Sequence, residues 1–182
     1  PTLVRSLAEA LGVPEAEIPA LRDALDRKDA AATREAAGGK SELFLTLLRL
    51  AGPADSALAK LAELPLPEGP AAEVAAMSRM VARIHASAPE LALTFDPSEH
   101  RGFEYQTGAS FTIFARGVRG ELGRGGRYVA QNNGKAEPAT GFTLFMDSVL
   151  RALPAAERPR AIYLPEGTDD AAAEALRDEG WG

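Results

Sequence analysis

The chain has 182 residues, of which 46 % are hydrophobic and 25 % are charged, and its formal net charge is −6. These proportions argue against a disordered, collagen-like or membrane-spanning chain, and the negative charge argues against general binding of nucleic acid. The sequence has no cysteine and only two histidines, so disulfides are excluded and neither a metal site nor a cofactor is expected.

Residues 1–90 are expected to be helical, because their leucines recur at helical spacing between glycines and prolines. Four short helices are predicted, which begin at Thr2, near Pro19, at Ser41 and at Ala54. Gly12 stands where the glycine after a helix belongs, and Ser41 can cap the third helix.

A run of proline and glycine at positions 65, 67, 69 and 70 is the clearest candidate for a linker. A longer helix is predicted beyond it, over residues 71–87. Four apolar residues of this helix form a stripe that is expected to be buried, namely Val74, Met77, Val81 and Ile84.

From residue 91 the apolar residues alternate with polar ones, which is typical of strands. Strands are predicted over residues 91–95, 111–116, 123–129 and 140–145, the last of them as a central strand. A turn at residues 117–120 makes a hairpin, and a helix is predicted over residues 146–153. The chain then ends in a short strand at residues 161–164 and a helix that Thr168 caps and Gly180 closes.

Positive charge gathers in one part of this acidic chain. Residues 101–135 contain six basic side chains against two acidic ones. Two interpretations stay open, namely solvated hairpin edges and a site for an anion or a partner.

Three motifs lie in a distinctive order along the second half of the chain, whereas no phosphate loop, dinucleotide fingerprint or nucleophile elbow is present. The motifs are RGFEYQTGASF (residues 101–111), GRGGRY (residues 123–128) and ATGFTLFMDSVLRAL (residues 139–153). In this order they resemble the second half of a histidyl-tRNA synthetase-type catalytic domain. The resemblance implies an α+β fold, part of a class II aminoacyl-tRNA synthetase-like antiparallel sheet with helices, preceded by a helical insertion.

The departures from this family pattern fall at positions that serve ATP in the synthetases. Ser148 stands in place of the arginine of the third motif, Asp147 in place of the glutamate before it, and Phe145 in place of a glycine. A hydroxyl cannot replace a guanidinium at a triphosphate, because both the charge and the forked geometry are lost. Gln106 replaces the second tyrosine of the first motif, and Val129 replaces an aspartate of the second. Adenylate formation is not expected with this set of changes.

The chain therefore resembles most the regulatory subunits of ATP phosphoribosyltransferase, which are non-catalytic paralogues of histidyl-tRNA synthetase. The resemblance implies assembly with a short-form catalytic subunit into a hetero-octamer, L-histidine as a feedback effector, and no membrane or nucleic-acid partner. It places the protein in the first step of histidine biosynthesis. A fragment of a histidyl-tRNA synthetase catalytic domain is the alternative.

The same resemblance implies a histidine-binding site. Its candidate residues are Arg101, Glu104, Tyr105, Gln106, Gly125, Gly126, Arg127 and Tyr128. Arg101 would face the carboxylate, the two tyrosines would line the imidazole, Gln106 would add a polar contact, and the glycines would let the backbone approach the ligand. Glu104 could face the ligand or pair with Arg127. In the opposing interpretation the charged residues pair within the fold and the tyrosines only pack.

These patterns divide the chain into three parts. Residues 1–69 are expected to be the helical insertion, residues 70–153 the second half of the synthetase-like core, and residues 154–182 a strand-helix unit. Because the chain starts with Pro1 and ends on a strand and helix without a return strand, it is expected to be a piece of a longer protein. No signal peptide is visible, so a cytoplasmic location is expected.

Overall fold

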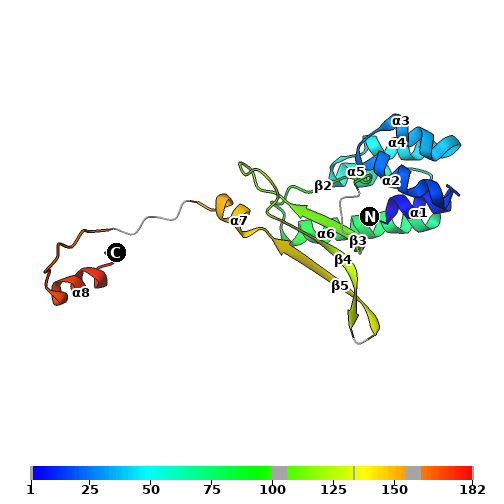
Figure 1. Cartoon of the computed structure of the whole chain (residues 1–182). Helices are drawn as coiled ribbons and strands as arrows, with labels where there is room; N and C mark the ends of the chain where they lie inside the picture. Colours follow the sequence, from blue (N-terminus) through cyan, green and yellow to red (C-terminus); the bar gives the residue numbers. More distant parts are fainter. Residues whose placement is uncertain (1, 100–105, 133, 155–160, 182) are drawn as a thin grey trace. The chain divides into compact units, whose positions relative to one another are not determined.

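The computed structural model describes residues 2–99, 106–132, 134–154 and 161–181 (Figure 1). The chain forms two compact units. The first consists of Pro1–Ile113 and Gly123–Leu144, and the second of Phe114–Leu122 and Phe145–Gly182.

Six α-helices begin the first unit and carry most of its core. They are α1 (Leu3–Ala10), α2 (Ile18–Asp26), α3 (Ala30–Ala37), α4 (Ser41–Arg49), α5 (Ala54–Ala62) and α6 (Glu68–Ser87). The four predicted short helices are confirmed as α1, α2, α4 and α5, and Gly12 follows α1 with a φ of 68°. Thr2 and Ser41 make no capping hydrogen bond; the Thr2 hydroxyl donates instead to Glu73 of α6 at 2.6 Å.

Helix α3 was not predicted, because its buried positions are occupied by small residues, Thr33 and Ala37. No large apolar side chains mark its period. Its start does carry a signal, since the Asp29 carboxylate accepts hydrogen bonds from the backbone N–H groups of Ala31 and Ala32, both at 3.0 Å.

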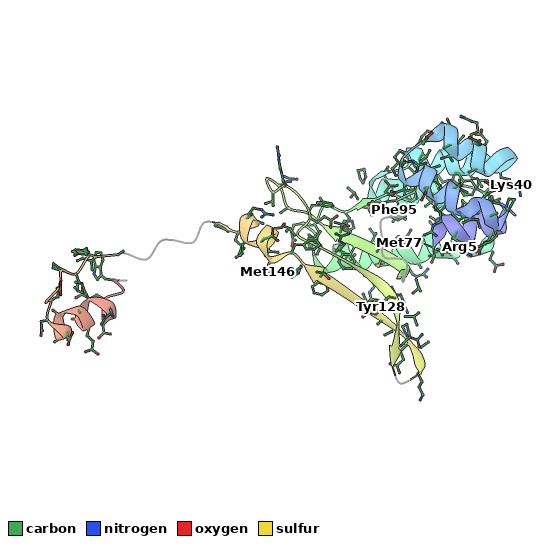
Figure 2. The ribbon with its side chains drawn as sticks, in the orientation of Figure 1. Arg5, Lys40, Met77, Phe95, Tyr128 and Met146 are labelled. Atoms are coloured by element: carbon green, nitrogen blue, oxygen red, sulfur yellow. The ribbon has the colours of Figure 1, made fainter. Side chains whose placement is uncertain are left out.

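The core of the helices is made of leucine, isoleucine and phenylalanine side chains that are almost fully buried, namely Leu7, Ile18, Leu21, Leu25, Phe44, Leu47 and Leu61. Helix α6 adds Val74 and Val81, which are buried, and Met77, which packs against the core (Figure 2). The predicted stripe is therefore confirmed at three of its positions, whereas Ile84 lies outside the buried cluster.

The predicted linker is shorter than expected, because α6 already begins at Glu68. Gly69 and Pro70 therefore lie in the first turn of a helix. Proline is tolerated there, since the backbone N–H groups of a first turn have no acceptor within the helix.

The strands form two antiparallel sheets. A two-stranded sheet joins β1 (Gly52–Pro53) to β2 (Thr94–Phe95), so the strand predicted over residues 91–95 shrinks to the two residues that find a partner. A three-stranded sheet has the order β3 (Gln106–Ile113), β4 (Gly123–Asn132) and β5 (Lys135–Leu144). The prediction of a central strand at residues 140–145 is wrong for the described sheet, because β4 pairs on both sides and β5 lies at its edge.

The second unit contains α7 (Met146–Ala152) and α8 (Asp170–Asp178), and Gly180 closes α8 with a φ of 86°. Thr168 does not cap α8; its hydroxyl donates to the Pro165 carbonyl at 2.7 Å. The strand predicted at residues 161–164 is wrong, since these residues have no strand partner in the described part of the chain. The division of the chain at residues 69 and 153 stays a prediction. Within the described ranges no helix is both long and apolar enough to cross a bilayer.

Candidate functional site

The pairing of β4 with β5 sorts the second and third motifs onto two faces of the sheet. The ladder runs without a break from Gly123 opposite Leu144 to Asn132 opposite Lys135. Side chains along a regular strand alternate between faces, and residues directly opposite each other share a face. Gly123, Gly125, Arg127 and Val129 therefore lie on one face, and Arg124, Gly126, Tyr128 and Ala130 on the other.

We call the first of these the apolar face, defined by Phe111, Ile113, Val129, Phe142 and Leu144. Gly125 lies between Phe111 on β3 and Phe142 on β5. A Cβ at Gly125 would lie 2.4 Å from the Gly141 carbonyl oxygen, 2.6 Å from the Phe142 Cβ and 2.7 Å from the Phe111 Cζ. The two phenylalanines thus occupy the space over bare backbone on the central strand.

We call the second the polar face, defined by Ser110, Thr112, Arg124, Tyr128 and Thr143. Its middle carries no side chain on two strands, because Gly126 lies opposite Gly141. The half-buried Tyr128, labelled in Figure 2, leans over Gly141, where a Cβ would lie 3.3 Å from the ring Cε1 and 3.5 Å from the hydroxyl oxygen. An aromatic ring and hydroxyl groups thus border this glycine platform, and Gly126 itself is buried.

The predicted site residues that the structure describes on β4 lie on two different faces of the sheet. Gly126 and Tyr128 lie on the polar face, whereas Gly125 and Arg127 lie on the apolar side of the same strand. The Arg127 stem packs against Gly108 of β3, where a Cβ would lie 3.4 Å from both Cβ and Cδ of Arg127. A ligand that lies over one face would meet side chains from only one of the two sets, and the predicted site stays a prediction.

The remaining candidates come from the first motif. Arg101, Glu104 and Tyr105 lie outside the described residues, and the backbone of Gln106 pairs with Tyr128. The register of β3 against β4 shifts between Gln106 and Ser110, so β3 holds two more residues than β4 over this stretch. The bulge falls inside the first motif, between Gln106 and the regular part of the sheet that begins at Ser110.

Three residues of the polar face were missed by the sequence analysis, namely Ser110, Arg124 and Gly141. Counting back from Tyr128 in steps of two would have placed Arg124 on its face. Ser110 and Gly141 depend on the pairing of separate strands, which the local sequence does not reveal.

Ser148, which stands in place of the arginine of the third motif, lies in α7 of the second unit. Ser148 is buried, and its hydroxyl accepts a hydrogen bond from the Arg151 Nη2 at 2.8 Å. The other guanidinium nitrogen, Nη1, donates to the Asp147 carboxylate at 3.0 Å, and this hydrogen bond lowers the pKa of Asp147. Arg151 therefore binds both Ser148 and Asp147 within one turn of helix.

A polar network holds the segment that leads into the first motif. The Lys28 ammonium donates to the Asp96 carboxylate at 2.5 Å and to the Ser98 hydroxyl at 2.6 Å, and Ser98 donates to Asp96 through its N–H at 3.0 Å and its hydroxyl at 2.8 Å. Burial raises the pKa of Asp96, but the hydrogen bonds from Lys28 and Ser98 and the Lys28 charge outweigh it, so this pKa is lowered. Residues 94–98 are thereby fixed to the turn between α2 and α3.

This network predicts a specific acid sensitivity. Because the folded-state pKa of Asp96 is lowered, its ionised form adds stability that is complete above the pKa of an unfolded aspartate and is lost as the pH falls through the folded value. We expect the stability advantage of the wild type over Asp96→Asn to be on the order of 1 kcal/mol near neutral pH, since water screens the exposed Lys28, and to vanish in acid. Urea unfolding from about pH 6 to about pH 2 measures it.

The control for this titration is Asp23→Asn, which changes an exposed carboxylate on α2. Its difference from the wild type should stay within about 0.5 kcal/mol. A wild-type advantage over Asp96→Asn that grows on acidification would contradict the prediction.

The sheet, the helices before it and the order of the motifs are those of a histidyl-tRNA synthetase-type domain. The sequence model of the family described as histidyl-tRNA synthetase matches residues 1–149, and the chain belongs to this family. A solved structure from Bacillus halodurans, described as an ATP phosphoribosyltransferase regulatory subunit/histidyl-tRNA synthetase, superposes with a TM-score of 0.69. That match covers 98 % of this chain and 48 % of the other at 21 % identity, and it confirms the predicted α+β, class II synthetase-like fold.

Within the family, similar curated proteins carry a more particular name. The chain is 51 % identical over its whole length to the ATP phosphoribosyltransferase regulatory subunit of Rhodospirillum centenum, of which it spans 46 %. It is 49 % identical to the protein of the same name from Paramagnetospirillum magneticum, of which it spans 47 %. The chain thus spans about half the length of these relatives, and their names support the regulatory subunit over the synthetase fragment.

Proposed function

We propose that this chain is part of a regulatory subunit of ATP phosphoribosyltransferase, which assembles in the cytoplasm with a short-form catalytic subunit as a hetero-octamer. It would be needed for assembly, for activity and for histidine feedback in the first step of histidine biosynthesis. The observation that carries this proposal is the shared name of relatives that are 40–51 % identical to the chain over its entire length.

The α7 geometry supports a subunit without adenylation or transferase chemistry of its own. A hydroxyl at position 148 is too short and uncharged to bind a triphosphate. Arg151 is the guanidinium nearest in sequence to it, and Arg151 is bound to Ser148 and Asp147. Electrostatic stabilisation of a phosphate in the transition state needs a cation aimed at that phosphate, whereas both Nη groups of Arg151 donate within α7.

The polar face supports histidine as the effector. Histidine has a carboxylate, an ammonium group and an imidazole, so its site needs a cation, an anion and a flat wall with hydrogen-bonding groups. Tyr128 and the Gly126–Gly141 platform offer such a wall. By resemblance, Arg101, Glu104, Tyr105 and Gln106 would complete the site from the adjoining segment of the chain.

The experiment that tests this function uses the full-length protein with and without the short-form catalytic subunit. We expect it to co-purify with that subunit, to raise its condensation of ATP with phosphoribosyl pyrophosphate by at least about tenfold, and to make the reaction sensitive to L-histidine. We also expect no ATP–pyrophosphate exchange dependent on histidine. Such exchange by the full-length protein would overturn the proposal in favour of the synthetase, and a lack of any effect on the catalytic subunit would overturn it outright.

A further inference from the structure

We propose that the outer face of α6 is a docking surface for an acidic segment of the short-form catalytic subunit. This inference rests on the proposed function, which supplies that partner, and it assigns the contact to one helix. We call the surface the α6 face, and it is an open hollow of about 580 Å³. In the described part of the chain its lining comes from α6 and includes Ala76, Arg79, Met80, Arg83, Ile84 and Ser87.

The first support is an apolar stripe that the helical core leaves uncovered. Ala76, Met80 and Ile84 are spaced four residues apart, so they lie on one side of α6 and span about 12 Å along its axis. Ile84 lies outside the buried cluster. Met80 is 37 % exposed, and it is the only exposed large apolar side chain in α1 to α6, all of which the structure describes. A methionine at such a position can adapt its shape to a partner.

The second support is the positive charge beside this stripe. Arg79 and Arg83 are exposed one turn apart, and neither side chain makes a hydrogen bond or an ion pair with the residues that the structure describes. Glu73, the acidic residue of α6 nearest to them in sequence, instead accepts hydrogen bonds from Thr2 and Ser6. Two such guanidinium groups next to an apolar stripe are complementary to the carboxylates of an amphipathic segment.

The same charge argues against two simpler accounts of this face. Two copies of the chain that joined through it would bring the arginines of both together, and like charges in an interface oppose association. The negative end of the helix dipole favours cations near the last turn of α6, but it does not account for the uncovered apolar stripe. An acidic partner satisfies the arginines and covers the stripe at once.

A second hollow is lined by residues of α3 and α4 and also contains two exposed arginines, Arg34 and Arg49. It includes the acidic side chain of Glu42, and its leucine Leu45 is already buried. This hollow therefore offers less free charge and less uncovered apolar surface than the α6 face. Its two arginines provide the matched control for the experiment.

The test is calorimetric titration of the short-form catalytic subunit with the full-length protein. We expect the double variant Arg79→Glu/Arg83→Glu to weaken binding by roughly tenfold to a hundredfold, because two attractive charges become repulsive. Met80→Gln, which makes the side chain polar at similar length, should weaken binding by about threefold to tenfold. Added salt should weaken binding of the wild type but not of the double variant.

The control Arg34→Glu/Arg49→Glu makes the same change of charge on the other hollow and should leave binding unchanged. Unchanged binding by Arg79→Glu/Arg83→Glu, or an equal loss in the control, would overturn the α6 face as the contact. Thermal unfolding of the full-length protein alone gives a second readout, and we expect the double variant to unfold at the wild-type temperature. A lower temperature would also overturn the inference, since another part of the same chain would then cover the face. A wild type that does not bind the catalytic subunit would instead remove the proposed function.

Discussion

Replacing Phe44 by alanine should destabilise the helical part of the first unit by about 3–5 kcal/mol. The Phe44 side chain is fully buried in the cluster that joins the helices, where it lies among Leu7, Ile18 and Leu21 in the same core. Truncation removes a large apolar surface from this core and leaves a cavity that helices on all sides cannot fill by collapse. Hydrogen exchange of the amides in α1, α2 and α4 should therefore quicken by about a hundredfold to a few thousandfold.

The matched control is Glu42→Ala, which truncates an exposed side chain two residues away on the same helix. Its effect should stay within about 0.5 kcal/mol. If Phe44→Ala changed exchange no more than this control does, Phe44 would not be a core residue in the folded protein.

The helices could be predicted because their signals are local. Gly12 follows α1 and Pro19 lies in the first turn of α2, so the sequence itself shows where these helices begin and end and how their apolar residues are spaced. Helix α3 was not predicted, because its alanine and threonine residues give no strong helical repeat of apolar side chains, although Asp29 caps it. Gly69 and Pro70 led to the opposite error, because they were interpreted as part of a linker although they lie in the first turn of α6. Both residues often end helices, but proline is tolerated in a first turn.

The candidate site was predicted less completely, because a face of a sheet is set by pairing between distant segments. The motifs pointed to Gly125, Gly126, Arg127 and Tyr128 as one group, but neighbours along a strand point to opposite faces. The composition of the polar face depends on which residues of β3 and β5 lie opposite β4, as Gly141 opposite Gly126 illustrates. Register is fixed only when the strands meet, and one residue of slip exchanges the faces.

Replacing Gly125 by alanine should separate β4 from β5. The added Cβ would meet the Gly141 carbonyl oxygen at 2.4 Å and the Phe142 Cβ at 2.6 Å, and neither atom can rotate away as the end of a side chain could. Forcing an extra carbon into a filled space destabilises by about 1–3 kcal/mol and sometimes more, because the backbone must move. Hydrogen exchange of the β4 and β5 amides in the full-length protein should quicken by roughly tenfold to a hundredfold, whereas exchange in the helices should not change.

Alanine at two further glycines should cost less stability than alanine at Gly125, because both have more space around them. At Gly141 the added carbon meets only the Tyr128 ring, 3.3 Å away, which can shift by a few tenths of an ångström, so Gly141→Ala should cost less than Gly125→Ala. At Gly52 no atom lies within 4 Å, and Gly52→Ala should be neutral or stabilising by up to about 1 kcal/mol, since alanine restricts the unfolded chain. The expected order of stability is therefore Gly52→Ala, then Gly141→Ala, then Gly125→Ala. Equal exchange rates for the three variants would mean that Phe111 and Phe142 do not close over bare backbone at Gly125, and that the two faces of the sheet are not as assigned.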